Sequence, residues 1–264
     1  LGFFMMIGAL MFLGCPLRMM LRIGGGDMNA IVGLVGFTAG ILAGIGFLNK
    51  GFSFKRAYKI SKADGYIFPA IQVAMLVLLL GTPALLAFSE EGPGSMHAPV
   101  AFALVGGLVV GAAAQKSRFC TAGGIRDAFL LKDLTLLIGF ISVILVVLIG
   151  NLALGSFHFG FEGQPVAHSD GVWNFLGMAL VGLAAVLLGG CPLRQLILSG
   201  EGNIDSVITV VGMLIGAAFS HNFGLASSAQ GPMFNGQIAV VIGFVAVAAI
   251  GFLNLQGRPE KGDA

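Results

Sequence analysis

The sequence predicts an all-α integral membrane protein, a polytopic bundle of membrane-crossing helices. Of its 264 residues, 57% are apolar and 10% are charged, so a water-soluble domain would have too few charged side chains to cover its surface. The apolar residues form long runs that do not alternate with polar ones. A membrane β-barrel would show short segments of alternating polarity, so the runs indicate helices.

Eight segments are long enough, or nearly so, to cross a bilayer, which needs roughly 20 apolar residues. Glycines recur at short spacing within them, as at Gly36, Gly40 and Gly44, and this permits close helix packing. We expect one transmembrane domain over 1–264. The segments lie at 1–14, 28–48, 66–88, 98–115, 134–154, 172–190, 204–220 and 236–254.

Charges are distributed unevenly among the connections between these segments. The connection 49–65 carries five Lys or Arg residues and one Asp, so the positive-inside rule places it in the cytoplasm. The connections 89–97 and 155–171 carry acids but no Lys or Arg, and 222–235 has no charge. We expect these three outside and the tail after Leu255 inside. The net charge of +2 is uninformative, because 14 basic and 12 acidic groups nearly cancel, and no polybasic tract suggests a nucleic-acid partner.

The five-residue motif Gly-Cys-Pro-Leu-Arg occurs twice in the chain. The two copies are 176 residues apart, and at that offset 14–47 aligns with 190–223 without a gap. A match over a loop and the helix that follows it indicates an internal repeat, with copies around 1–48 and 172–223.

The two copies are expected to face opposite sides of the membrane. Five apolar segments separate Cys15 from Cys191, and five crossings invert the chain. Inverted repeats with broken helices near the midplane are typical of transporters. The third cysteine, Cys120, lies in a loop at 116–127. Its counterpart in the first copy would fall before Leu1, so we expect additional N-terminal helices.

The motif combines residue types that suit an anion site. Three widely spaced cysteines argue against a disulfide framework or a four-thiolate metal site, so we expect them to act as thiols, with no metal. In the motif, glycine lets the backbone turn, proline begins or ends a helix, and arginine supplies a permanent cation. Helix N-termini nearby also favour anions. Loop and helix-start support is expected from Gly14, Pro16, Gly190, Pro192 and the candidate N-caps Asp27 and Asn203.

Simpler interpretations stand beside this one. A cysteine in an apolar segment is usually a small buried hydrophobic residue. Arg18 and Arg194 could reach to the membrane interface or pair with Asp27 or Asp205. The histidines outside the spans are expected to be exposed in loops, whereas His221, which stands where the first copy has Ile45, could be polar lining. The loop histidines are His97, His158 and His168.

Three sets of residues resemble the YeeE/YedE membrane transporter family. They are the two Gly-Cys-Pro-Leu-Arg motifs, Ser-Arg-Phe-Cys followed by Ile-Arg-Asp, and Gly-Glu-Gly-Asn-Ile-Asp-Ser after the second motif. The similarity to the selenium-metabolism YedE branch is closest over 14–66 and 189–228. YeeE-type relatives take up thiosulfate through an inverted-repeat fold in which central cysteines pass the ion along by hydrogen bonding.

The resemblance implies a multi-pass permease of the bacterial inner membrane, not an enzyme, for a small sulfur- or selenium-containing anion. It implies no cofactor, and a cytosolic sulfur or selenium carrier protein as a partner besides the membrane lipid. The expected substrate pathway comprises Cys15, Cys120, Cys191, Arg18, Arg194 and Arg118. One alternative is a membrane sulfur- or selenium-transfer enzyme with a cysteine persulfide or selenosulfide intermediate. Another is a structural subunit whose repeat serves packing alone.

Overall fold

The computed structural model describes residues 1–54, 62–82 and 98–255, and these fold almost entirely as helices. They contain three isolated β-bridges and no β-strand, which confirms the predicted all-α class. The helices are α1 (Gly2–Phe12), α2 (Pro16–Gly25), α3 (Met28–Asn49), α4 (Lys62–Gly81), α5 (Val100–Lys116), α6 (Thr121–Leu130), α7 (Thr135–Ala153), α8 (Gly171–Leu187), α9 (Pro192–Gly200), α10 (Ile204–Asn222) and α11 (Phe234–Leu253).

The predicted membrane-crossing segments correspond to helices. Seven helical stretches in the described part of the chain are long and apolar enough to cross a membrane, and an eighth, Gly65–Gly81, is apolar but shorter. The multi-pass membrane class is therefore confirmed. The predicted connection 89–97, with His97, and most of the charges of 49–65 lie outside the described residues, as does the chain after Leu255.

Each cysteine is followed by a short helix that the sequence analysis treated as part of a loop. These helices, α2, α6 and α9, are 9 or 10 residues long, too short to span a bilayer, so an apolar run of spanning length does not reveal them. Pro16 and Pro192 occupy the first helical position of α2 and α9. Proline fits there because its missing N–H has no partner in the first turn.

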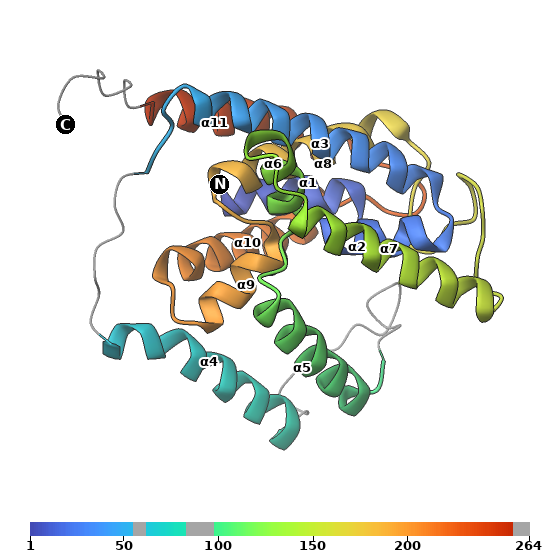
Figure 1. Ribbon diagram of the computed structural model, residues 1–264, viewed down its shortest axis with the longest axis horizontal. Helices are drawn as coiled ribbons and strands as arrows, with labels where there is room; N and C mark the ends of the chain where they lie inside the picture. The colour runs from blue at the N-terminus through green and yellow to red at the C-terminus, as the bar shows by residue number, and fades with distance from the viewer. Residues whose placement is uncertain (55–61, 83–97, 256–264) are drawn as a thin grey trace.

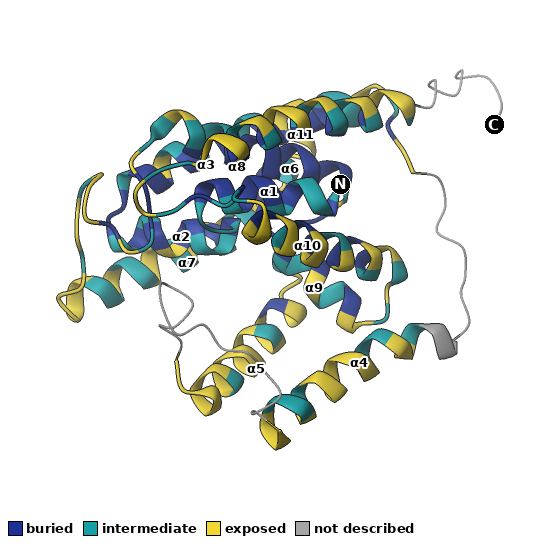
Figure 2. Ribbon diagram, turned by 180° about the vertical axis from the view of Figure 1, so that it is seen from behind, coloured by how far each residue is buried: buried dark blue, intermediate teal, exposed yellow. Residues whose placement is uncertain are grey.

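Helices α1 and α8 form the centre of the molecule. Helix α8 packs against α3, α1 and α11, and α1 packs against α8, α10 and α11 (Figure 1). Every residue of α8 from Gly177 to Leu187 is buried. Figure 2 shows the same division, with buried residues gathered on α1 and α8 and exposed ones on α4 and α5.

Glycines bring the central helices into backbone contact. On α3, Gly36 and Gly40 face the carbonyl oxygens of Phe175 and Ala179 on α8 so closely that neither position has room for a Cβ atom. A Cβ on Gly8 would lie 2.5 Å from the carbonyl oxygen of Gly177 on α8. Small residues at such crossings let membrane helices gain van der Waals contact where no hydrophobic driving force exists.

The contact between α3 and α8 has a counterpart between α10 and α1. Gly40 faces the carbonyl of Ala179, and Gly216 faces the carbonyl of Phe3. The 176-residue offset relates the two contacts. Gly40 corresponds to Gly216, and Phe3 corresponds to Ala179. Each repeat copy therefore places the helix after its short helix against the first helix of the other copy.

We expect Gly40→Ala to weaken the fold by about 1–3 kcal/mol, the usual cost of overpacking, because the added methyl would meet the Ala179 backbone. Gly46→Ala, also on α3, is the matched control, since nothing lies within 4 Å of a Cβ there. Thermal unfolding of both variants in the same detergent measures the difference. Equal stability of the two variants would contradict the proposed α3–α8 contact.

Candidate functional site

The three cysteines occupy the same position in three turns of the same kind. Each is the N-cap of a short helix: Cys15 of α2, Cys120 of α6 and Cys191 of α9. Two residues earlier, each turn has a residue with positive φ, which ends the preceding long helix. These residues are Leu13 (φ 62°), Arg118 (φ 54°) and Gly189 (φ 78°).

One backbone hydrogen bond recurs in all three turns. The N–H of the residue before each cysteine donates to the carbonyl of an alanine five residues earlier, as expected for a left-handed helix C-cap. The distances are 2.8 Å from Gly14 to Ala9, 2.9 Å from Phe119 to Ala114 and 2.9 Å from Gly190 to Ala185. The sequence analysis linked Cys120 to the others mainly through family resemblance; the alanine six residues before each cysteine was the missed local signal.

The far ends of the short helices also match. A residue with positive φ follows each helix, and the next residue is Asp or Asn. Its side chain accepts a backbone N–H at the start of the following long helix, which satisfies a donor that has no partner within the helix. The pairs are Gly26 with Asp27, Lys132 with Asp133, and Gly202 with Asn203. The helices α5, α6 and α7 thus repeat the backbone pattern of α1–α3 and α8–α10.

The N-cap position brings each sulfur close to the positive end of a short helix. Cys120 Sγ accepts the N–H of Gly123 at 3.2 Å. The Cys15 thiol lies near the N–H groups of Leu17 and Arg18 without completing a cap hydrogen bond. The free N–H groups of a helix N-terminus favour negative charge, so an anion beside one of these thiols would also face backbone donors.

The three turns bring the thiols together. Cys120 and Cys191 contact each other through their side chains, and Cys15 lines a cavity together with Pro192, the residue that follows Cys191. Cys15 is half-buried, whereas Cys120 is 6% and Cys191 1% exposed. The fully buried hydroxyl of Thr121 lies beside Cys191 and has no hydrogen-bond partner of good geometry. All three cysteines are free thiols.

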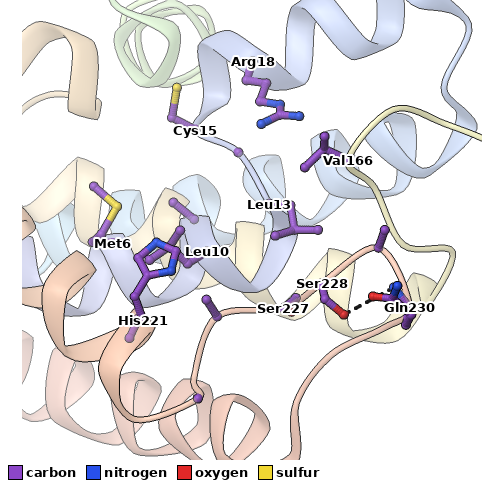
Figure 3. Close-up of a pocket in the computed structure, with 16 residues that line it drawn as sticks. Met6, Leu10, Leu13, Cys15, Arg18, Val166, His221, Ser227, Ser228 and Gln230 are labelled. Atoms are coloured by element: carbon purple, nitrogen blue, oxygen red, sulfur yellow. Dashed lines mark hydrogen bonds between the residues drawn. The ribbon is translucent and has the colours of Figure 1, made fainter. Parts of the chain in front are cut away.

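A cavity of about 890 Å³ leads to Cys15. Figure 3 shows Arg18 and His221 beside it on different elements, with Ser227, Ser228 and Gln230 contributed by the connection after α10. Its lining is Met6, Ala9, Leu10, Leu13, Gly14, Cys15, Arg18, Val166, Ser220, His221, Gly224, Ala226, Ser227, Ser228, Ala229 and Gln230. We call this the Arg18 cavity. Its lining contains basic and neutral polar side chains and no acid.

A second, apolar cavity lies on the other side of Cys15. It has a volume of about 370 Å³, and Cys15 and Met6 line both cavities. Its other walls include Pro192 and Leu193, the first two residues of α9, which directly follow Cys191. Cys15 therefore stands between the polar Arg18 cavity and the turn that carries Cys191.

The three candidate arginines have different surroundings. Arg18 lines the polar cavity. Arg194 is half-buried, and its Nη1 is buried without a hydrogen-bond partner. Arg118 is exposed at the end of α5 and lines none of the described cavities. Neither Arg18 nor Arg194 forms an ion pair with a described residue.

Asp27 pairs instead with Arg22, a residue that the sequence analysis did not single out. Arg22 Nε donates to Asp27 Oδ2 at 2.6 Å, and both side chains are buried. Arg22 also donates to the carbonyl of Phe12 at 2.8 Å and stacks on its ring at 4.1 Å. Buried charges need such partners, because removing them from water is costly. Spacing along the chain gave no way to choose between Arg18 and Arg22.

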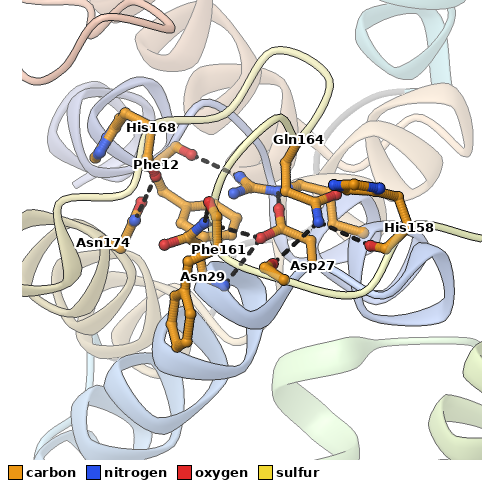
Figure 4. A network of polar contacts seen from close by, with 10 residues as sticks. Phe12, Asp27, Asn29, His158, Phe161, Gln164, His168 and Asn174 are labelled. Carbon is orange, nitrogen blue, oxygen red and sulfur yellow. Dashed lines mark hydrogen bonds and ion pairs between the residues drawn. The ribbon is translucent and has the colours of Figure 1, made fainter.

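The same network fastens the connection between α7 and α8 over the corner of α2 and α3 (Figure 4). Asn29 donates to the carbonyl of Phe161 at 2.6 Å, and the N–H of Met28 donates to that of Gly160 at 3.0 Å. The connection then places Val166, which has a φ of 49°, in the wall of the Arg18 cavity. Positive φ is strained for a β-branched residue, so the surrounding contacts must hold it.

His168 belongs to this connection, and the prediction that it is exposed was wrong. It is 2% exposed, whereas His158 is exposed as predicted. The Nε2 of His168 donates to the carbonyl of Met11 at 2.8 Å, and Nδ1 accepts the N–H of Asp170 at 3.3 Å, the arrangement of a neutral ring. Burial lowers the pKa of His168. The Met11 carbonyl lies 157 residues away along the chain, so the sequence pattern could not reveal this partner.

Comparison with known proteins identifies the family of the chain. Residues 116–257, more than half of the chain, match the family described as sulphur transport. The chain belongs to the sulphur transport family. The predicted YeeE/YedE resemblance is thereby confirmed, whereas the selenium branch stays a prediction. The matched residues include Cys120 and Cys191, while Cys15 precedes them.

Among curated relatives of the sulphur transport family, the chain is 28% identical over 142 residues to the thiosulfate transporter TsuA of Escherichia coli (strain K12). The match covers 51% of this chain and 39% of that protein. No solved structure matches the chain significantly.

We expect this member of the sulphur transport family to lose stability as pH falls below about 6.5, the ordinary pKa of histidine. The folded state holds His168 neutral with a lowered pKa, so the unfolded chain binds the proton more readily. This contribution is complete above pH 6.5 and is lost as pH falls toward the folded-state pKa. Thermal unfolding of His168→Gln between pH 5 and 8 should depend less on pH than wild type, whereas exposed His158→Gln should match wild type. An unchanged pH dependence in His168→Gln would contradict this assignment.

Proposed function

We propose that this protein carries a small sulfur- or selenium-containing anion across the bacterial inner membrane, along a path guided by Cys15, Cys191 and Cys120. The observation that carries the proposal is the recurrence of one backbone turn, which presents three thiols at helix N-termini and brings them together. Thiosulfate is the first candidate substrate, because the curated relative is a thiosulfate transporter.

The chemistry of the path suits an anion that passes without reacting. A neutral thiol is a weak donor and a weak acceptor, so it can hold an oxygen or sulfur of the anion loosely and release it. A thiolate would repel the substrate. The Arg18 cavity adds a cation at the entrance, and backbone N–H groups at the short helices add uncharged donors.

The two-sided layout follows from the repeat. We propose that α1–α3 and α8–α10 form an inverted repeat, on the basis of the 176-residue offset and the charges of the connections. The Arg18 cavity takes lining residues from 155–171 and 222–235, the two connections expected outside. An anion would enter there and move past Cys15 toward Cys191. A cytosolic sulfur or selenium carrier would then be its acceptor.

The persulfide enzyme remains the alternative chemistry. In that case, a cysteine thiolate would attack the terminal sulfur of thiosulfate, the S–S bond of thiosulfate would break and sulfite would leave, which gives a cysteine persulfide. The selenium analogue of thiosulfate would give a selenosulfide in the same way. Intact-mass measurement after incubation with thiosulfate separates the two ideas, because an added sulfur atom on any of the three cysteines would favour group transfer over passage. The family assignment supports transport.

Replacement of Cys191 with alanine should reduce uptake of radiolabelled thiosulfate into proteoliposomes at least tenfold, because the Cys191 side chain contacts that of Cys120 and its turn borders the cavity that Cys15 lines. Cys191→Ser is the matched control. Its hydroxyl keeps a donor at the same place, so it should retain more uptake than Cys191→Ala. Uptake at the wild-type rate after replacement of all three cysteines with alanine would overturn the thiol path.

Replacement of Arg18 with glutamine should raise the KM for thiosulfate roughly fivefold, the effect of one unit charge near an anion in a watery cavity. The maximal rate should change less, and the KM effect should shrink at high salt. Lys116→Gln removes the same charge from an exposed position that lines none of the described cavities. If Lys116→Gln and Arg18→Gln shift KM equally, the entrance role of Arg18 is wrong.

A further inference from the structure

The two repeat copies differ where each short helix meets the following long helix. In the first copy, Arg22, Asp27 and Asn29 fill this corner with a buried network that the 157–168 connection covers. At the 176-residue offset, the second copy has Leu198, Asn203 and Asp205 instead. The arginine is gone, and the acid has moved from the N-cap to the second helical position.

The corner of the second copy is open. A cavity of about 720 Å³ occupies it, which we call the Asp205 cavity. Its lining is Leu1, Gly2, Phe3, Phe54, Leu188, Gln195, Leu198, Asn203, Asp205, Ser206, Ile208, Thr209 and Gly212. Among these residues, Asp205 carries the single charged side chain.

This cavity approaches the buried cysteines from a different direction than the Arg18 cavity. Gln195, in its wall, donates through Nε2 to the carbonyl of Leu188 at 3.0 Å and through its backbone N–H to the carbonyl of Cys191 at 3.0 Å. The cavity therefore ends one helical turn from Cys191. The Arg18 cavity ends at Cys15, and the two cavities share no lining residue.

The neighbours of the Asp205 cavity belong to the connections expected in the cytoplasm. Phe54 in its wall comes from 49–65, and the adjacent Phe52 forms a β-bridge with Leu255, next to the C-terminal tail. The corner residue Gly202 also lies against Gly65 of α4, the helix that follows the 49–65 connection. By contrast, the Arg18 cavity is bordered by the connections expected outside.

We propose that the Asp205 cavity is the release mouth of the anion path and that Asp205 lowers the occupancy of the anion there. The proposal rests on the proposed transport function. An anion leaving Cys191 would enter this cavity of about 720 Å³, whose largely apolar walls also carry amides, hydroxyls and one carboxylate. With arginine at the entrance and aspartate at the exit, the anion is held more tightly at the outer mouth than at the inner one, so low concentrations are captured outside and the bound anion leaves readily inside.

Asp205→Asn should lower the KM for thiosulfate added on the release side about fivefold, the effect of one unit charge at contact distance in water. Asparagine is the residue that the first copy carries at this position, Asn29. Initial rates are measured from each side across proteoliposomes of known orientation, and the maximal rate from the release side should fall in proportion to KM, because the anion is then held more tightly at that mouth. Glu201→Gln is the matched control, because Glu201 is an exposed acid of the same corner that does not line the cavity. Equal effects of the two variants would overturn the proposal.

A second measurement does not require transport. Ile208 lines the cavity one turn after Asp205 and is 65% exposed. Ile208→Cys is labelled with an anionic and a cationic methanethiosulfonate reagent, and mass spectrometry of the peptide containing position 208 distinguishes it from native cysteines. When Asp205→Asn is added to Ile208→Cys, the labelling rate with the anionic reagent should rise severalfold relative to that with the cationic reagent, because a negative charge has been removed from the cavity. When Glu201→Gln is added instead, the ratio of the two labelling rates should not change. An unchanged ratio in both overturns the role of Asp205, even if transport proceeds. If Asp205→Asn raises the ratio of labelling rates but no variant, nor the wild type, transports thiosulfate, the electrostatic effect of Asp205 on the cavity is supported and the transport function is rejected.

Discussion

The structure depends on ending helices in an apolar environment without leaving backbone groups unsatisfied. A helix that stops inside a bilayer has no water to bond its last carbonyls, and a helix that starts there has none to accept its first N–H groups. Here a residue with positive φ turns the chain back, and the next N–H bonds an alanine carbonyl of the finished helix. The cysteine that follows begins a new helix. The position of each thiol is thus a by-product of backbone bonding, which explains why one turn serves three sites.

The membrane-crossing helices were predictable because the thickness of the bilayer sets the number of apolar residues that a spanning helix needs. The repeat was also visible, since Cys15 and Cys191 lie in identical motifs. The short helices were not, because 9 or 10 amphipathic residues resemble a loop in hydropathy. The third unit was missed because Cys120 lacks the proline, and the residues that it does share, such as the alanine six positions earlier, are too common to stand out. The geometry of the turn is set by backbone hydrogen bonds, and these can form with different side chains at the same positions.

The sequence pointed to the three cysteines as the candidate site, but it revealed only some of the polar residues around them. Arg22 and His168 have partners far away in sequence, Phe12 and Met11 among them. Such contacts depend on how helices cross, and hydropathy carries no information about crossings. Asp27 was assigned its capping role correctly from local sequence, because a cap bonds residues two or three positions ahead. Local bonds could be read from the sequence, whereas long-range ones needed the fold.

The glycine crossings of α1, α3, α8 and α10 have a consequence for kinetics. Backbones that touch at Gly8, Gly40 and Gly216 leave no side chains to yield when one repeat moves against the other. Passage by rocking of whole repeats would have to break these contacts, and such domain motions take microseconds to milliseconds. With rigid walls, the moving parts reduce to rotating thiols and the long side chain at the entrance, whose rotations take picoseconds to nanoseconds. The protein would then behave as a fixed conduit, with a shallow dependence of turnover on temperature.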